Sequence, residues 1–164
     1  MTIIEVMITS AILLVVLLAT LSSFETVSNA QAYQADRTKT LDDMRGVLNR
    51  LTKDLRQATT VAEASSTAST ITFTTAINGA STQVVYVASG TTLTRKIGTA
   101  AAFTVLTGLA TTSIFTYVSA GSLTGVQWVE MNLQVTPARL PTTTLVLDSE
   151  VNLRNRTSAL TASS

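Results

Sequence analysis

The chain opens with a run of apolar residues that is long enough to cross a membrane. Residues 3–21 are almost wholly apolar and contain one charged side chain, Glu5. A helix rises about 1.5 Å per residue, so about 20 residues span the roughly 30 Å hydrocarbon core of a bilayer. A secretory signal peptide would carry a basic start, a shorter apolar stretch and a small-residue cleavage site, and the run has none of these features. The pattern predicts a hydrophobic transmembrane helix over residues 1–24.

Helical periodicity continues beyond the apolar run. No strong helix breaker comes before Gly46, which inside a helix costs only about 1 kcal/mol relative to Ala. From residue 41 onward the apolar side chains recur in steps of three and four, which places them in one stripe on one helix face. The stripe comprises Leu41, Met44, Leu48, Leu51, Leu55, Ala58 and Ala62. We expect an amphipathic continuation of the helix over residues 25–63.

The two sides of this continuation predict different surroundings. Its apolar stripe needs a partner, and the core of a folded head is a simpler partner than a groove for another helix. The opposite side carries charged residues, which we interpret as a face in contact with solvent. These residues are Arg45, Arg50, Lys53, Asp54 and Arg56.

After residue 64 the periodicity changes from helical to alternating. Ile71 and Phe73 alternate with Thr, and residues 84–87 follow across Asn78-Gly79, a dipeptide that favours a tight hairpin turn. Further strands are expected at residues 92–97, 103–106, 113–118, 126–135 and 143–153. In the segment around Trp128, apolar and polar residues alternate, so one face of that strand should cover the helical stripe.

These elements predict an α+β fold. We expect a long N-terminal α-helix whose hydrophobic half protrudes and whose amphipathic half packs on the head. The head, residues 64–157, is expected to be a globular domain built on an antiparallel β-sheet, followed by a flexible tail over residues 158–164.

Composition narrows the classes of function. More than a quarter of the residues are Thr or Ser, charged residues make up 13% and the formal net charge is +1, so nothing points to nucleic acid as a partner. Cys and His are both absent, which excludes thiol chemistry and leaves a catalytic triad or a His-ligated metal without its usual groups. We expect no enzymatic activity, no cofactor and no metal site.

Three weaker sequence motifs do not change the expected class of function. Asn155 begins a glycosylation sequon, a motif that is frequent by chance. A basic cluster of Arg95, Lys96, Arg154 and Arg156 lacks interleaved aromatic residues, so a solvated rim explains it better than nucleic-acid binding. Asp148 and Glu150 would share one face of a strand and could hold a cation, but two such acids are ordinary strand-edge charges.

The N-terminal pattern resembles a known family. Thr2-Ile3-Ile4-Glu5-Val6 is similar to the mature N-terminus of type IV pilins and pseudopilins, in which Thr, two aliphatic residues, Glu and an aliphatic residue open a long hydrophobic helix. Met1 stands where family members usually have Phe, and we take the sequence to be the processed form. The β-rich part resembles J-type minor pseudopilins and W-type minor pilins through Tyr86-Val87, Leu93-Thr94-Arg95, residues 126–135 and residues 151–155.

The resemblance implies how the chain would assemble. Cleavage of a leader would expose the α-amino group of Met1, which would be N-methylated, and Glu5 of one subunit would meet that amine of its neighbour. The filament core would be packed by aliphatic side chains, namely Ile3, Ile4, Val6, Ile8, Leu13, Leu14, Leu17 and Leu18. A second interpretation of Glu5 is that it is solvated at the membrane boundary or stabilises the helix N-terminus through the macrodipole.

The expected function follows from the resemblance. The chain would be a structural subunit of an extracellular type IV pilus-like filament, held in the cytoplasmic (inner) membrane before assembly. Its partners would be further copies of itself, a prepilin peptidase, a platform protein and an assembly ATPase. One alternative is a minor pilin or pseudopilin that initiates or tips a filament used in secretion, competence or motility. Another is a single-pass membrane-anchored extracellular binding module.

Overall fold

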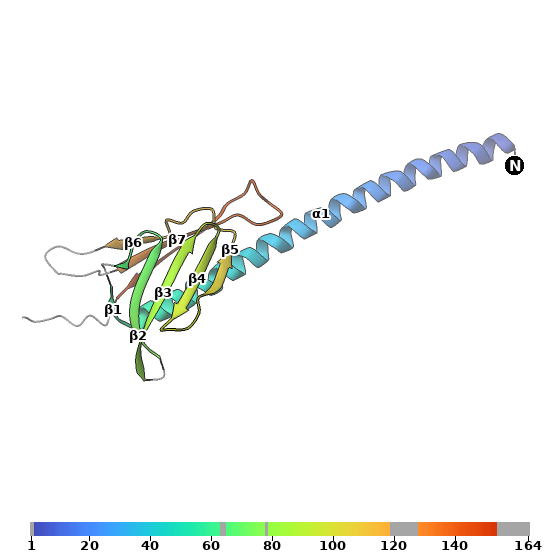
Figure 1. The fold of residues 1–164 in the computed structure, drawn as a ribbon. Coiled ribbons are helices and arrows are strands. Elements are labelled where there is room, and N and C mark those ends of the chain that lie inside the picture. The colour runs from blue at the N-terminus through green and yellow to red at the C-terminus, as the bar shows by residue number, and fades with distance from the viewer. Residues whose placement is uncertain (1, 63–64, 78, 119–127, 154–164) are drawn as a thin grey trace, which may run out of the picture. The chain divides into compact units, whose positions relative to one another are not determined.

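The computed structural model describes residues 2–62, 65–77, 79–118 and 128–153 and has one long helix followed by strands. Helix α1 spans Ile3–Arg56. The strands are β1 (Ala58–Val61), β2 (Thr70–Ile77), β3 (Ala80–Ser89), β4 (Thr92–Ile97), β5 (Phe103–Thr107), β6 (Phe115–Val118), β7 (Trp128–Val135) and β8 (Leu145–Asn152). The α+β prediction is confirmed (Figure 1). The tail expected over residues 158–164 lies outside the described residues.

The chain divides into two units within α1. The first, Met1–Thr38, is called here the N-terminal unit, and the second, Lys39–Ser164, the β-rich unit. The buried residues of α1 are Met44, Leu48, Leu51 and Leu55, all in the β-rich unit. The division follows the sequence pattern, because the apolar stripe that needs a folded partner begins only near residue 41.

The strands form two antiparallel sheets. The first has the order β1-β2-β3-β4-β5, and the second has the order β6-β7-β8. Two hairpins of the first sheet turn where glycine supplies a positive φ: Gly79 at +79° follows β2, and Gly90 at +56° follows β3. The predicted hairpin across residues 78–79 is confirmed, with Ile77 opposite Ala80.

Backbone hydrogen bonds connect the two sheets. The amide of Ala110 donates to the carbonyl of Gln134 at 2.9 Å, and the amide of Thr136 donates to the carbonyl of Gly108 at 2.8 Å. The segment that follows β5 therefore also pairs with the end of β7. One stretch of chain thus contacts both sheets and fixes the second sheet to the first.

Side chains from α1 and from both sheets share one hydrophobic core. The four buried residues of the helical stripe belong to it, and its aromatic members include Phe73 and Tyr86. Burial alternates along β7, where the buried residues are Val129, Met131, Leu133 and Val135. The last turns of α1 pass along one face of the β1–β5 sheet (Figure 1). The predicted packing of the stripe is confirmed for these residues.

The helix ends earlier than the sequence pattern predicts. The continuation expected over residues 25–63 stops at Arg56, and residues 58–61 form the edge strand β1. Thr59, Thr60 and Val61 are β-branched, which disfavours a helix and favours a strand, and β2 offers them an open edge for pairing. Ala58 is buried as the stripe predicts, but it is buried as part of a sheet.

Candidate functional site

The first candidate site is the surface of the N-terminal unit. The eight aliphatic side chains predicted to pack a filament core are all exposed, from 50% for Val6 to 82% for Ile3. The helix is long and apolar enough to cross a membrane, and it lies near the N-terminus, where a signal sequence can pass the same test. An apolar surface of this extent is compatible with anchoring in a membrane.

Glu5 and Thr2 cap the start of the helix. The amide of Glu5 donates to Oγ1 of Thr2, and the amide of Thr2 donates to Oε2 of Glu5, both at 3.4 Å. This reciprocal arrangement is a capping box, whose Thr-x-x-Glu signature is visible in the sequence at residues 2–5. It agrees with the interpretation in which Glu5 stabilises the helix N-terminus. Both contacts are long, so the carboxylate keeps acceptor capacity for a further partner.

Hydroxyl groups within the apolar helix bond to the helix itself. Thr9 donates to the carbonyl of Glu5 at 2.9 Å, and Thr20 donates to the carbonyl of Leu17 at 2.8 Å. Ser23 donates to the carbonyl of Ala19 in the same way. A polar group without a partner is costly in an apolar surrounding, so these bonds fit the segment to lipid or to a packed bundle. Helix α1 continues without a break past Ser23.

A shallow hollow lies on the same helix surface. Small side chains at Ala19 and Ser23 stand between the larger Val16, Phe24 and Val27. Small residues on an apolar helix allow the backbone of another helix to approach closely. Nothing in the described part of the N-terminal unit covers this hollow.

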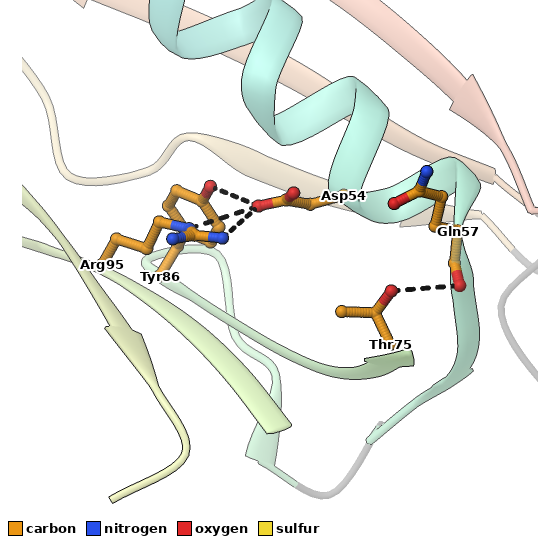
Figure 2. Close-up of polar contacts among 5 residues, drawn as sticks. All are labelled: Asp54, Gln57, Thr75, Tyr86 and Arg95. Atoms are coloured by element: carbon orange, nitrogen blue, oxygen red, sulfur yellow. Dashed lines mark hydrogen bonds and ion pairs between the residues drawn. The ribbon is translucent and has the colours of Figure 1, made fainter. Parts of the chain in front are cut away.

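The second candidate site lies in the β-rich unit, where three polar side chains meet against the core. Oδ2 of Asp54, from the last turns of α1, accepts hydrogen bonds from Nη2 of Arg95 at 2.8 Å, Nε of Arg95 at 3.2 Å and the hydroxyl of Tyr86 at 3.0 Å (Figure 2). Burial raises the pKa of the Tyr86 phenol, and the negative charge of Asp54 raises it further. The phenol therefore remains a hydrogen-bond donor at any ordinary pH.

Arg95 is held on several sides. Its guanidinium lies 5.7 Å from the ring centroid of Tyr86 and 5.9 Å from that of Phe103. Its side chain is only 4% exposed, and Nη1 is buried with no hydrogen-bond partner among the described residues. A buried donor without a partner is unusual in a folded protein.

Two of the sequence interpretations are wrong at this cluster. Asp54 was expected on the solvated side of the helix, but it is partly buried and paired with Arg95. Arg95 was expected on a solvated basic rim, but it is buried on the inner face of β4. The physical reason is that each charge neutralises the other where the helix meets the sheet.

Four predicted positions lie outside the described residues, namely Met1, Arg154, Asn155 and Arg156.

A basic pocket opens beside this cluster. It has a volume of about 660 Å³ and is lined by Arg50, Lys53, Asp54, Gln57, Arg95 and Ile97, among others. Three cationic side chains face one carboxylate there, and that carboxylate is already bonded to Arg95. The pocket is therefore suited to an anionic group.

The outer face of the second sheet is acidic. Glu130 of β7 lies directly opposite Glu150 of β8, and Asn132 lies opposite Asp148 and donates to its carboxylate. The prediction that Asp148 and Glu150 share a face is confirmed by the alternation along β8. Among the residues that the structure describes, no group of three or more potential ligands is placed to hold a metal ion.

Comparisons of the chain with protein-family models, with curated proteins and with solved structures find no match.

Proposed function

We propose that this chain is a structural subunit of an extracellular type IV pilus-like filament. In this proposal it is anchored in the cytoplasmic membrane by the first half of α1 before assembly, and it polymerises through the same helix. The observation that carries the proposal is the combination of an exposed, membrane-length apolar helix with one acid at position 5 and a separately packed β-rich unit.

The exposed apolar surface of the N-terminal unit suits two successive environments, the membrane before assembly and the filament after it. Monomeric soluble proteins rarely expose an apolar surface of this size. Lipid can cover it in the membrane, and the helices of other copies can cover it in a polymer. Hydroxyl groups that bond within their own helix are compatible with both surroundings.

In this proposal, Glu5 sets the axial position of each subunit relative to its neighbour in the filament. A carboxylate in an apolar surrounding is costly unless it finds a partner, and the α-amino group of Met1 in a neighbouring subunit is a group of opposite charge at the matching depth. The long capping contacts to Thr2 leave Glu5 able to take that partner. Each added subunit would then be positioned by one such pair.

Other proteins would process the subunit and assemble it. Removal of a leader by a prepilin peptidase would free the amino group of Met1 for N-methylation. An assembly ATPase acting through a platform protein would then extract the subunit from the membrane. A minor pilin or pseudopilin would follow the same route but would be present in far fewer copies.

Intact-mass spectrometry of filaments sheared from the producing cells tests this function. We expect the chain to be a bulk component of the sheared fraction, with a methylated amino group on Met1. A processed chain at trace level would identify a minor subunit. A chain that stays in the membrane fraction and never enters filaments would contradict the proposal and favour an anchored binding module.

A further inference from the structure

Two cations of the basic pocket have no ion-pair partner among the described residues. Arg50 and Lys53 stand three residues apart on α1, so they are neighbours on one helix face. Neither makes an ion pair within the described chain, whereas the adjacent Asp54 is occupied by Arg95. Like charges held side by side repel, and this cost is relieved when an anion binds.

The third cation of the pocket is buried and has a donor without a partner among the described residues. Arg95 lines the basic pocket, its side chain is almost wholly buried, and its Nη1 lacks a hydrogen-bond partner in the described residues. Guanidinium groups form their strongest hydrogen bonds with carboxylates and phosphates. Among the described residues, the pocket thus combines two exposed cations that have no ion pair with a buried arginine whose Nη1 has no hydrogen-bond partner.

The acidic face of the second sheet has an excess of negative charge, opposite in sign to the charge of the basic pocket. Glu130 and Glu150 are direct cross-strand partners on the exposed side of the second sheet. Like charges directly opposite each other in a sheet are destabilising. No ion pair joins either carboxylate to a cation in the part of the chain that the structure describes.

We propose that the basic pocket of one copy of the chain docks on the acidic face of the next copy, with Glu130 and Glu150 against Arg50 and Lys53. This contact rests on the proposed filament function and deepens it, because it names the surfaces that join the β-rich units of neighbouring subunits. Each copy carries both surfaces, so along the proposed filament the contact repeats head-to-tail from one copy to the next. A head-to-tail contact builds a ring or an open polymer rather than a closed two-fold dimer.

Charge reversal in the full-length chain tests the contact in the producing cells. We expect Arg50→Glu with Lys53→Glu to lower the amount of chain in sheared filaments by about tenfold or more, and Glu130→Lys with Glu150→Lys to do the same. The four substitutions together restore the opposite charges and should bring the yield back to within about threefold of the unaltered chain. Exchanging the exposed pair, Asp42→Arg with Arg45→Asp, is the matched control and should leave the yield unchanged.

A cross-linking experiment remains informative if a reversed variant folds poorly. The chain has no cysteine, so Lys53→Cys combined with Glu130→Cys or with Glu150→Cys should give a ladder of disulfide-linked multimers when intact filaments are oxidised. Lys96→Cys combined with Glu130→Cys should give none, because Lys96 lies outside the pocket.

The outcomes separate the contact from the function. Filaments that form at full yield from both reversed variants, without a ladder from either cysteine pair, would overturn the contact and leave the filament function standing. Loss of filaments only when the basic pocket is reversed would point to a different anionic partner and would also overturn it. An unaltered chain that never enters filaments would overturn the function and the contact together.

Discussion

Arg95 and Asp54 join strand β4 to the end of α1, with Nη2 of the arginine 2.8 Å from Oδ2 of the aspartate. The two side chains are 4% and 16% exposed, so both charges are largely withdrawn from water. Their attraction offsets a desolvation cost that either charge alone would bear in full. The pair therefore fixes where the helix lies on the sheet more than it adds to the stability of the fold.

Breaking this pair should cost more than replacing it. Asp54→Ala leaves the buried guanidinium without a counter-charge and should lower the free energy of unfolding by about 3 kcal/mol, the lower end of the range for buried pairs because Asp54 keeps some contact with water. Asp54→Leu with Arg95→Met removes both charges and should recover most of that loss. Urea denaturation of the full chain in detergent, followed by Trp128 fluorescence, measures both.

The exposed pair of Asp42 and Arg45 is the matched control. Its side chains are 67% and 61% exposed at a separation of 3.5 Å. Asp42→Ala should change the free energy of unfolding by less than about 0.5 kcal/mol. An equal loss from Asp42→Ala and Asp54→Ala would contradict the role given to the buried pair.

Periodicity was sufficient to predict most of the fold. The apolar run, the stripe from Leu41 to Leu55 and the hairpin across residues 78–79 each depend on local spacing, and the structure contains them. Burial along β7 follows directly from alternation in the sequence. Local patterns are sufficient to predict these elements because each helix or strand turns one face to the core. Its buried residues therefore recur with the period of that element.

The Asp54 cluster depends on contacts between distant segments, which spacing alone cannot fix. Leu93, Arg95 and Ile97 alternate on one face of β4, so an inward position for Arg95 was visible as a local signal. The identity of its partner was not visible, because Asp54 lies 41 residues away and stands among cations on the helix. The capping box of Thr2 and Glu5, by contrast, could have been predicted from its spacing.

The helical stripe should carry a large share of the stability of the β-rich unit. Leu51 is 1% exposed, and Leu51→Ala should lower the free energy of unfolding by about 2–5 kcal/mol through lost burial and the cavity left behind. Leu14 is 59% exposed, so Leu14→Ala should leave the unfolding of the β-rich unit unchanged. The same urea titration of both variants makes the comparison, and equal effects would contradict the division into two units.

Two glycines should respond in opposite directions to Ala. At Gly46 in α1 an added Cβ meets nothing within 4 Å, so Gly46→Ala should raise the free energy of unfolding by about 0.5–1 kcal/mol. Gly108 has φ +81°, and a Cβ there would lie 3.0 Å from the carbonyl oxygen of Thr136. Gly108→Ala should therefore destabilise the fold by more than about 1 kcal/mol. Thermal unfolding in detergent distinguishes the two signs.

Replacing Glu5 should separate anchoring from assembly. Glu5→Leu keeps the apolar helix and should leave insertion in the membrane unchanged, but it removes the carboxylate that would pair with Met1 of a neighbour. We expect a loss of about tenfold or more in the sheared filament fraction, equivalent to about 1.4 kcal/mol or more per subunit added. Glu25→Leu, a substitution of the same kind farther along the exposed helix, is the control. Normal filaments from Glu5→Leu would show that Glu5 serves only as a helix cap.

Two tyrosines packed in or against the core should make the fold sensitive to alkali. Burial raises the pKa of Tyr86 and of Tyr117, and the hydroxyl of Tyr117 donates to the carbonyl of Thr70 at 2.7 Å. Above about pH 10 the unfolded chain loses these protons while the folded chain keeps them, so the free energy of unfolding should fall by about 1.4 kcal/mol per pH unit for each tyrosine. The stabilisation is complete below that pH. It is lost as the pH rises toward the pKa values that the two tyrosines have in the folded chain.

The slope of this fall is the quantity to compare between variants. Urea titrations between about pH 9 and about pH 12 should show a shallower fall for Tyr86→Phe and for Tyr117→Phe than for the unaltered chain, because each variant lacks one of the coupled protons. Tyr33→Phe, at an exposed position of α1, is the control and should keep the full slope. Equal slopes for all these proteins would contradict the assignment, because the ionisation of neither buried phenol would then be coupled to unfolding.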